Sequence, residues 1–116
     1  MFITFETGVG SVTGANFLVE TKEKKFLVDC GMIQGDHETE KQNRLPFSYN
    51  PADIDYLFVT HAHLDHVGRI GKLIKDGFKG EIYSTPETFA LAQLVMADAV
   101  SILGLEAKKE NIPPIY

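Results

Sequence analysis

Three histidines and one aspartate lie within six residues of one another, in the segment Thr60-His61-Ala62-His63-Leu64-Asp65-His66. In an extended backbone, side chains two residues apart lie on the same side, so His61 and His63 can turn toward one ion. If the chain enters a helix near Asp65, then Asp65 and His66 point toward a second, adjacent ion. Imidazole nitrogens and carboxylate oxygens are ordinary ligands of Zn²⁺, with Mn²⁺ or Fe²⁺ as alternatives. The spacing therefore predicts a site for two metal ions.

The ligand count of this predicted site is low. A catalytic zinc usually has three protein ligands and an open water position, whereas each of two ions would receive only two ligands here. The one other histidine, His37, lies in a polar run and is expected to be a solvated loop residue. We therefore expect the missing ligands to come from sequence outside this chain. The alternative is a histidine-rich loop without metal, in which Asp65 only caps a helix.

Asp29 is the second residue that could serve such a site, because it closes the apolar run Phe26-Leu27-Val28. A carboxylate at the end of a buried strand is costly unless it is hydrogen-bonded, so Asp29 is predicted to orient the ligand loop from behind. An aspartate that merely ends the strand in a turn is the alternative. Cys30, next to it, is expected to be a small buried hydrophobic residue.

Five short apolar or β-branched runs predict the strands that would position these residues: 2–5, 15–20, 26–28, 56–60 and 81–84. The run 56–60 is apolar on both faces, as in parallel strands covered by helices, and the histidine loop follows it directly. Ligands of α/β proteins usually bind at this end of the strands. The segment 31–51 is polar and interrupted by glycine and proline, so it is expected to be an irregular loop that is pinned or functional.

Two helices are predicted between and after the last strands. Residues 67–76 are expected to be helical because apolar residues recur at helical spacing, at Val67, Ile70 and Ile74, and Gly77 is placed to end that helix. The second helix begins after Thr85 as N-cap and is expected to end at Gly104. An apolar stripe of the second helix is expected to pack in the core: Phe89, Ala92, Met96, Ala99 and Leu103. Strands that alternate with helices indicate an α/β layered fold.

Composition limits the classes of protein. The 116 residues suit one small domain, and the net charge of −5 argues against a polybasic nucleic-acid module. A single cysteine excludes an internal disulfide and fits a reducing compartment. No signal peptide and no membrane-spanning run are expected, so a cytoplasmic protein is expected. Residues 111–116 resemble the approach to a further element, which indicates a fragment.

The sequence resembles the metallo-β-lactamase superfamily. It is most similar to the β-CASP branch of RNA-processing nucleases, which includes the endonuclease subunit of the cleavage and polyadenylation specificity factor and bacterial and archaeal relatives. The matching motifs are 10–16, 27–35, Pro46-Phe47, 54–69 and 77–85. The resemblance covers essentially the whole chain and implies the N-terminal half of an αββα sandwich, with 1–116 as the N-terminal part of that domain.

This resemblance also implies a mechanism. His61 and His63 would bind one zinc ion, and Asp65 and His66 the other, with Asp65 also orienting the attacking hydroxide. Asp29 matches the first family motif, as a residue behind the ligands. The implied reaction is hydrolysis of RNA phosphodiester bonds by a hydroxide held between two metal ions about 3.5–4 Å apart.

Some family features are not found in these residues: a later histidine ligand, a bridging aspartate and the β-CASP cap. The isolated chain is therefore expected to be inactive, and activity is expected of the full-length form. Two other functions stay open. One is a superfamily hydrolase of thioesters, lactones or sulfur esters, which the acidic charge favours. The other is a non-catalytic fragment that binds a partner, and a dimer could supply ligands in trans.

Overall fold

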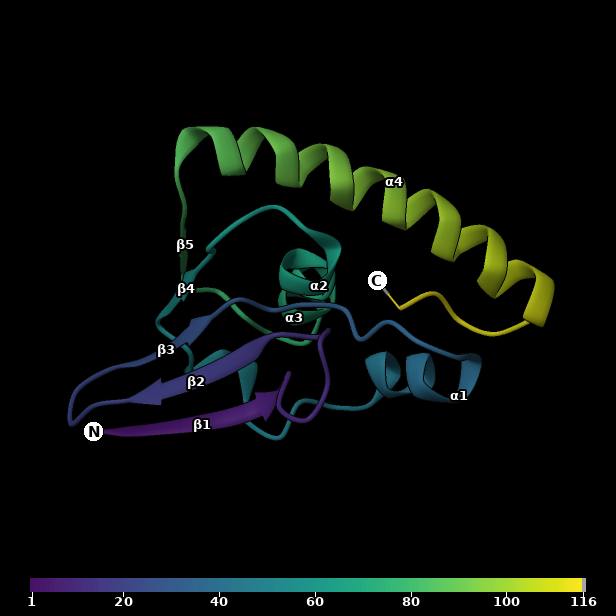
Figure 1. The fold of residues 1–116 in the computed structure, drawn as a ribbon. Coiled ribbons are helices and arrows are strands. Elements are labelled where there is room, and N and C mark those ends of the chain that lie inside the picture. Colours follow the sequence, from purple (N-terminus) through teal and green to yellow (C-terminus); the bar gives the residue numbers. More distant parts are fainter. Residues whose placement is uncertain (116) are drawn as a thin grey trace.

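The computed structural model describes residues 1–115, in which a five-stranded sheet packs against helices (Figure 1). The strands, in their order across the sheet, are β1 (Phe2–Thr7), β2 (Asn16–Glu20), β3 (Lys25–Val28), β4 (Tyr56–Phe58) and β5 (Glu81–Tyr83). The helices are α1 (His37–Glu40), α2 (Leu64–Val67), α3 (Ile70–Lys75) and α4 (Pro86–Glu110), with 3₁₀ turns at Lys41–Arg44 and Pro51–Asp53. This is the α/β fold that the sequence predicts.

The sheet is mixed. β1, β2 and β3 are antiparallel neighbours, whereas β3, β4 and β5 run parallel. All five predicted strands are present, but β4 ends at Phe58 rather than at Thr60. The N–H of Val59 still donates to the carbonyl of Tyr83 at 2.9 Å, so the chain leaves the sheet just before the histidine loop.

The core lies between one face of the sheet and the helices. Leu27 and Leu57 are paired across β3 and β4 and are fully buried. The core residues around them are Leu18, Cys30, Ile54, Ala62, Val67, Ile70, Leu73, Phe78 and Ala92. The opposite face carries aromatic side chains, among them Phe58, which is 39% exposed. The prediction that this strand is buried on both faces is therefore wrong for one face within the described residues.

The helix predicted over 67–76 is two short helices, α2 and α3. Gly68 lies at the junction, where an added Cβ would come within 2.6 Å of the Leu64 carbonyl oxygen and of the Met32 Cβ. Arg69 then leaves helical geometry at φ −105° and ψ 10°. The new direction buries Leu73 and leaves Ile74 exposed, so the placement of Ile74 on the buried face is wrong, whereas Val67 and Ile70 are buried. Gly77, at φ 117°, follows the end of α3 as predicted.

The long helix α4 starts at Pro86, with Thr85 as its N-cap, but it does not end at Gly104. It continues to Glu110 and stops at Asn111, which adopts the left-handed conformation at φ 54°. Gly104 faces open space and no turn forms there. Small residues make the buried stripe: Ala92, Ala99 and Ala107. Phe89, predicted to be in the core, is exposed.

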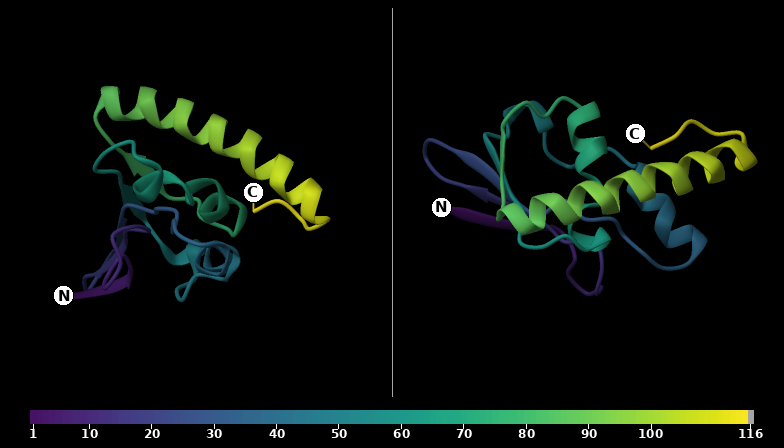
Figure 2. Two further views of the ribbon diagram at one scale, coloured as in Figure 1. Left: turned by 45° about the vertical axis from the view of Figure 1, so that its right-hand side comes forward. Right: turned by 90° about the horizontal axis from the view of Figure 1, so that it is seen from above.

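α4 forms a layer of its own that crosses the other elements (Figure 2). Over an 18-residue window its mean hydropathy is 1.7, and 11% of that window is buried. Length and composition would thus allow this helix to span a membrane, contrary to the expectation that no segment qualifies. Core helices of soluble proteins can be equally long and apolar, although they are mostly buried, so a single such helix is weak evidence for a membrane location.

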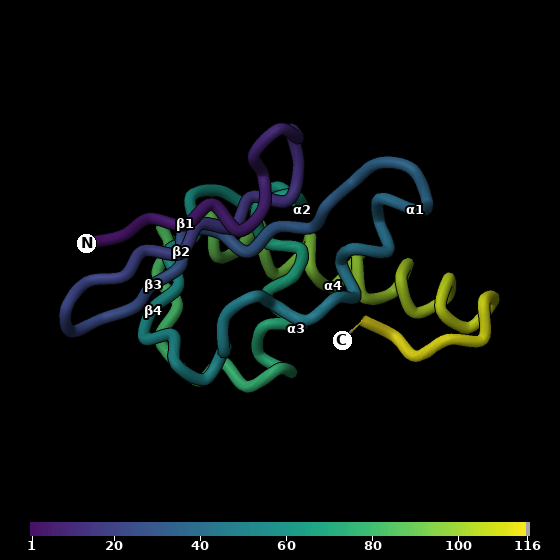
Figure 3. The backbone as a smooth tube through the Cα atoms, turned by 90° about the horizontal axis from the view of Figure 1, so that it is seen from below, coloured from purple at the N-terminus to yellow at the C-terminus, as the bar shows by residue number. Residues whose placement is uncertain are grey.

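The segment 31–51 is more ordered than predicted, since it contains α1 and a 3₁₀ turn. It is pinned through Asn43, whose side chain accepts from the N–H of Ile33 and donates to its carbonyl, both at 2.7 Å. In Figure 3 α1 and the C-terminal end of α4 lie at one end of the molecule, with the β2–β3 hairpin at the other. The histidine loop lies between these two ends.

Candidate metal centre

The candidate site lies where the parallel strands β3 and β4 end. Asp29 follows β3, and its N–H donates to the carbonyl of Phe58, the last residue of β4, at 2.9 Å. The histidine loop, residues 60–66, follows β4 and enters α2 after His63, whose backbone is extended at φ −67° and ψ 147°. The predicted change from extended to helical backbone therefore occurs within the motif, one residue before Asp65.

The imidazoles of the loop are brought together. The ring centroids of His61 and His66 are 3.9 Å apart, and those of His61 and His63 are 4.8 Å apart. The Nε2 atom of His66 lies 3.6 Å from a carboxylate oxygen of Asp65. His63 is exposed, and the other three side chains are partly buried. The four predicted ligands thus share one small region at the edge of the sheet.

Asp29 is the hydrogen-bond acceptor behind this loop. It is 1% exposed, and its backbone adopts the left-handed conformation at φ 60°. One carboxylate oxygen accepts from the N–H of Thr60 at 2.8 Å. The other oxygen lies 2.7 Å from the Thr60 hydroxyl and 2.7 Å from Nδ1 of His66. The buried carboxylate therefore has three polar partners, which offset the cost of its desolvation.

These contacts determine the proton positions on two imidazoles. A carboxylate can only accept, so His66 donates from Nδ1 and Thr60 donates its hydroxyl proton to Asp29. The Thr60 oxygen, 3.0 Å from Nδ1 of His61, then acts as an acceptor there, and His61 must donate from Nδ1. Both rings keep the Nε2 lone pair free. An imidazole with a hydrogen-bonded Nδ1–H and a free Nε2 is the usual metal-binding tautomer.

Backbone hydrogen bonds hold the loop against the segment after β3. The N–H of Ala15 donates to the Asp65 carbonyl, and the N–H of Cys30 donates to the His66 carbonyl, each at 2.9 Å. Gly31 lies so close that an added Cβ would stand 1.6 Å from the carbonyl oxygen of Asp65. Cys30 is fully buried, as predicted, and its burial raises the pKa of the thiol to about 12.

The donor types fit divalent metal ions, but the geometry limits how many reach one ion. Among residues 1–115, no three His, Cys, Asp or Glu side chains are grouped so that they could hold one ion by themselves. His37 lies apart in α1, where its ring is 3.9 Å from the carboxylate of Glu110. A complete site would therefore need ligands in addition to those grouped here.

Sequence reasoning did not assign roles to three residues that support the site. Thr60 links Asp29 to His61 through its hydroxyl group. Its position directly before the first histidine of the motif is the sequence feature that could have indicated this role. Asn16 donates to the Asp29 carbonyl at 2.9 Å, and Tyr49 donates to Asn16 at 2.9 Å. No spacing rule indicates these last two, because the contacts join residues distant in sequence.

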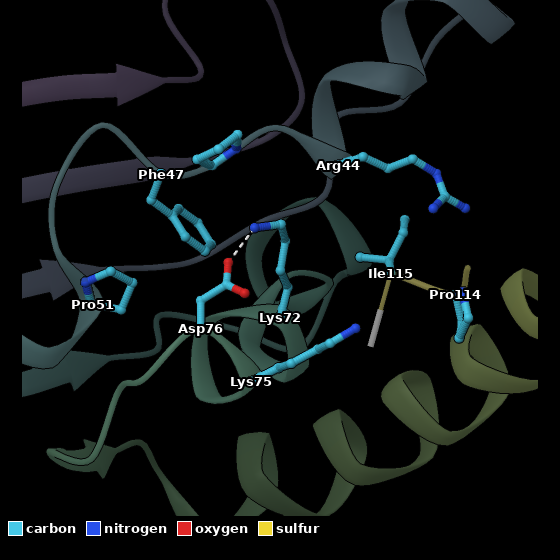
Figure 4. A pocket seen from close by; sticks show the side chains of 9 residues that line it. Arg44, Phe47, Pro51, Lys72, Lys75, Asp76, Pro114 and Ile115 are labelled. Carbon is cyan, nitrogen blue, oxygen red and sulfur yellow. Dashed lines mark hydrogen bonds and ion pairs between the residues drawn. The ribbon is translucent and has the colours of Figure 1, made fainter. Parts of the chain in front are cut away.

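Two cavities lie away from the four predicted ligands. One, of about 480 Å³, is shown in Figure 4 and contains the ion pair between Lys72 and Asp76. The Lys72 amino group also lies 4.5 Å from the centre of the Phe47 ring. A larger cavity of about 810 Å³ lies between α1 and α4, with Leu64 of the histidine loop in its wall. Neither cavity is lined by His61, His63, Asp65 or His66.

Comparison with known proteins gives a consistent family. The model of the metallo-beta-lactamase superfamily matches residues 10–115. Ribonuclease TTHA0252 of Thermus thermophilus is 41% identical over 92 residues, which are 79% of this chain and 21% of that protein. Transcription termination factor FttA of Methanosarcina mazei is 38% identical over 92% of this chain and 17% of its own length. The cleavage and polyadenylation specificity factor 73 of Drosophila melanogaster is 31% identical over 88% and 15%.

Among solved structures, rubredoxin oxygen:oxidoreductase of Desulfovibrio gigas is similar, with a TM-score of 0.53 and 25% identity. The match covers 75% of this chain and 22% of that one. The chain thus spans about a fifth or less of the length of these curated relatives.

Proposed function

Because this chain belongs to the metallo-beta-lactamase superfamily and its relatives lie in the β-CASP nuclease branch, we propose that it forms part of a metal-dependent ribonuclease. The reaction is hydrolysis of RNA phosphodiester bonds by the full-length protein. The observation that carries this proposal is the histidine loop, in which Asp29 and Thr60 leave Nε2 of His61 and His66 free.

In this proposal His61 and His63 would hold one ion, Asp65 and His66 would hold the second, and Zn²⁺ is the expected metal. Bound divalent ions supply Lewis-acid chemistry, since they polarise a phosphoryl oxygen and acidify water. Asp65 orients the attacking water by accepting a hydrogen bond from it. Asp29 fixes the His66 ring, so that little conformational entropy is lost when the ligands converge.

The test is an RNA cleavage assay of the full-length protein, after metal removal by a chelator and again after zinc is added back. Cleavage should disappear on chelation and return with zinc. His63→Ala should reduce cleavage to background, whereas His37→Ala is the matched control and should cleave like the unchanged protein. Undiminished cleavage by His63→Ala would eliminate these ligands from the mechanism.

A second candidate is a superfamily hydrolase that acts on thioesters or lactones. The net charge of −5 favours it, because RNA binding normally uses basic surface. The same preparations should therefore be assayed on a thioester and a lactone. Metal-dependent hydrolysis of these substrates without RNA cleavage would select this alternative.

A further inference from the structure

We propose that Asn16 and Tyr49 are positioning residues for the candidate metal centre. They hold the backbone of Asp29 so that its carboxylate presents Nε2 of His66 and His61 to the ions. This inference rests on the proposed function, because it assigns residues to support the same site. It adds a hydrogen-bonded chain that starts outside the histidine loop and ends at the ligands.

The first step of the chain is the contact between Asn16 and Asp29. Asn16 is 1% exposed, and its Nδ2 donates to the Asp29 carbonyl oxygen at 2.9 Å. Asn16 begins β2, one residue beyond the pair Phe17–Val28, so the strand register itself sets it beside Asp29. A buried amide placed against a single carbonyl in this way constrains that peptide group.

The constraint matters because Asp29 has a positive φ of 60°. A non-glycine residue in this region is strained by about 1 kcal/mol or more, and the surrounding contacts must maintain the conformation. The N–H of Asp29 is tied to Phe58, and its carbonyl is tied to Asn16. If the carbonyl were released, the backbone could relax and carry the carboxylate away from Thr60 and His66.

Tyr49 supplies the second step. Its hydroxyl donates to Oδ1 of Asn16 at 2.9 Å. Because Oδ1 accepts this bond, the amide must present its NH₂ group, not its oxygen, to the Asp29 carbonyl. Burial raises the pKa of Tyr49, so the hydroxyl keeps its proton and remains a donor. The Phe47 ring stacks on Tyr49 at a centroid distance of 5.2 Å and holds it in place.

A merely structural role would lower stability without changing the imidazoles, so the test must observe the rings. The metal-free chain is labelled with ¹⁵N, and long-range ¹H–¹⁵N spectra at pH 8 report which ring nitrogen carries the proton. Co²⁺ titration of the full-length protein, followed by visible absorption, measures metal affinity. The variants are Tyr49→Phe, Asn16→Ala and the double substitution.

Tyr56→Phe is the matched control, because within the described part of the chain the Tyr56 hydroxyl makes no hydrogen bond. We expect a single Nδ1–H form of His66 in the unchanged chain and in the control. Tyr49→Phe should give a mixture of tautomers and weaken Co²⁺ binding by roughly three- to tenfold, with a larger loss for Asn16→Ala. The double variant should lose less than the product of the two single losses.

Unchanged His66 nitrogen shifts in Tyr49→Phe would overturn the inference, even if stability falls. If Asn16→Ala fails to fold, Tyr49→Phe still decides, because it removes only one oxygen atom. Absence of Co²⁺ binding to the unchanged full-length protein would instead contradict the proposed function. In that case the metal-free spectra still decide whether Asn16 and Tyr49 position the ring.

Discussion

The chemistry of the candidate centre depends on one buried carboxylate. Asp29 accepts from the backbone and hydroxyl of Thr60 and from His66, and these three bonds leave both Nε2 atoms free. A neutral amide at this position could not accept from every one of these donors, since one of its two heavy atoms is itself a donor. The negative charge would also favour a cation bound at Nε2 of His66.

Asp29→Asn tests this role with little change of shape, because asparagine tolerates the left-handed backbone at this position. We expect zinc affinity to fall by roughly 10- to 100-fold, because one donor among Thr60 and His66 loses its acceptor. Isothermal titration of the metal-free chain measures the effect. Asp53→Asn, at an exposed position in a 3₁₀ turn, should bind like the unchanged chain. If Asp29→Asn bound zinc as tightly as Asp53→Asn, the role of Asp29 in supporting metal binding would be excluded.

At the scale of the elements, the site depends on the close approach of two segments. The turn after β3 and the start of α2 come so near at Gly31 that no side chain fits between them. In contrast, Gly104 in the middle of α4 has nothing within 4 Å of where its Cβ would be. Two glycines with opposite surroundings therefore give a matched pair of substitutions.

Gly31→Ala should push the histidine loop away from Asp29 and destabilise the chain by about 3 kcal/mol or more. Gly104→Ala should stabilise it by about 0.5–1 kcal/mol, because alanine loses less backbone entropy in a helix. Thermal unfolding by circular dichroism measures both changes. A Gly31→Ala chain as stable as the unchanged one would show that the two segments do not approach this closely.

The elements also show what the sequence can predict. Apolar runs locate all five strands, and the histidine spacing locates the loop at the end of a strand. The break between α2 and α3 is not predictable, because the apolar residues keep helical spacing across it and only the structure shows Arg69 leaving helical geometry. The continuation of α4 past Gly104 is not predictable either, since glycine ends a helix only where a turn can form. Asn16 and Tyr49 meet across 33 residues, so only the fold reveals their contact.

Across the whole molecule, the described residues bury one apolar layer and leave several apolar side chains exposed, many of them on two surfaces. One is the outer side of α4, with Leu91, Leu94 and Leu105. The other is the aromatic face of the sheet, where the Phe58 and Tyr83 rings stack at 5.6 Å. Exposed apolar surfaces of this kind often mark interaction sites. The buried layer also contains ionisable groups, so the free energy of unfolding should depend on pH.

Cys30 and Tyr49 lie in or beside this layer, and burial raises the pKa of each. For Cys30 the folded-state pKa is about 12, above the ordinary value of 9.0. The contribution of the neutral thiol to the free energy of unfolding is therefore complete below pH 9 and is lost as the pH rises toward 12. Above pH 9 the free energy of unfolding should fall as the pH rises. Cys30→Ala should make this fall smaller by up to about 1.4 kcal/mol per pH unit, and Tyr49 should account for the fall that remains. Urea unfolding at pH 8, 9.5 and 10.5 measures these slopes, and identical slopes would contradict the prediction.

The central claim is that the histidine loop binds metal, and zinc titration of the metal-free full-length protein tests it most directly. Comparing the unchanged protein with His63→Ala and His37→Ala separates binding at the loop from binding elsewhere. The account predicts zinc binding that His63→Ala weakens at least about tenfold and His37→Ala leaves unchanged. No binding by the unchanged protein, or equal affinity in His63→Ala, would contradict it.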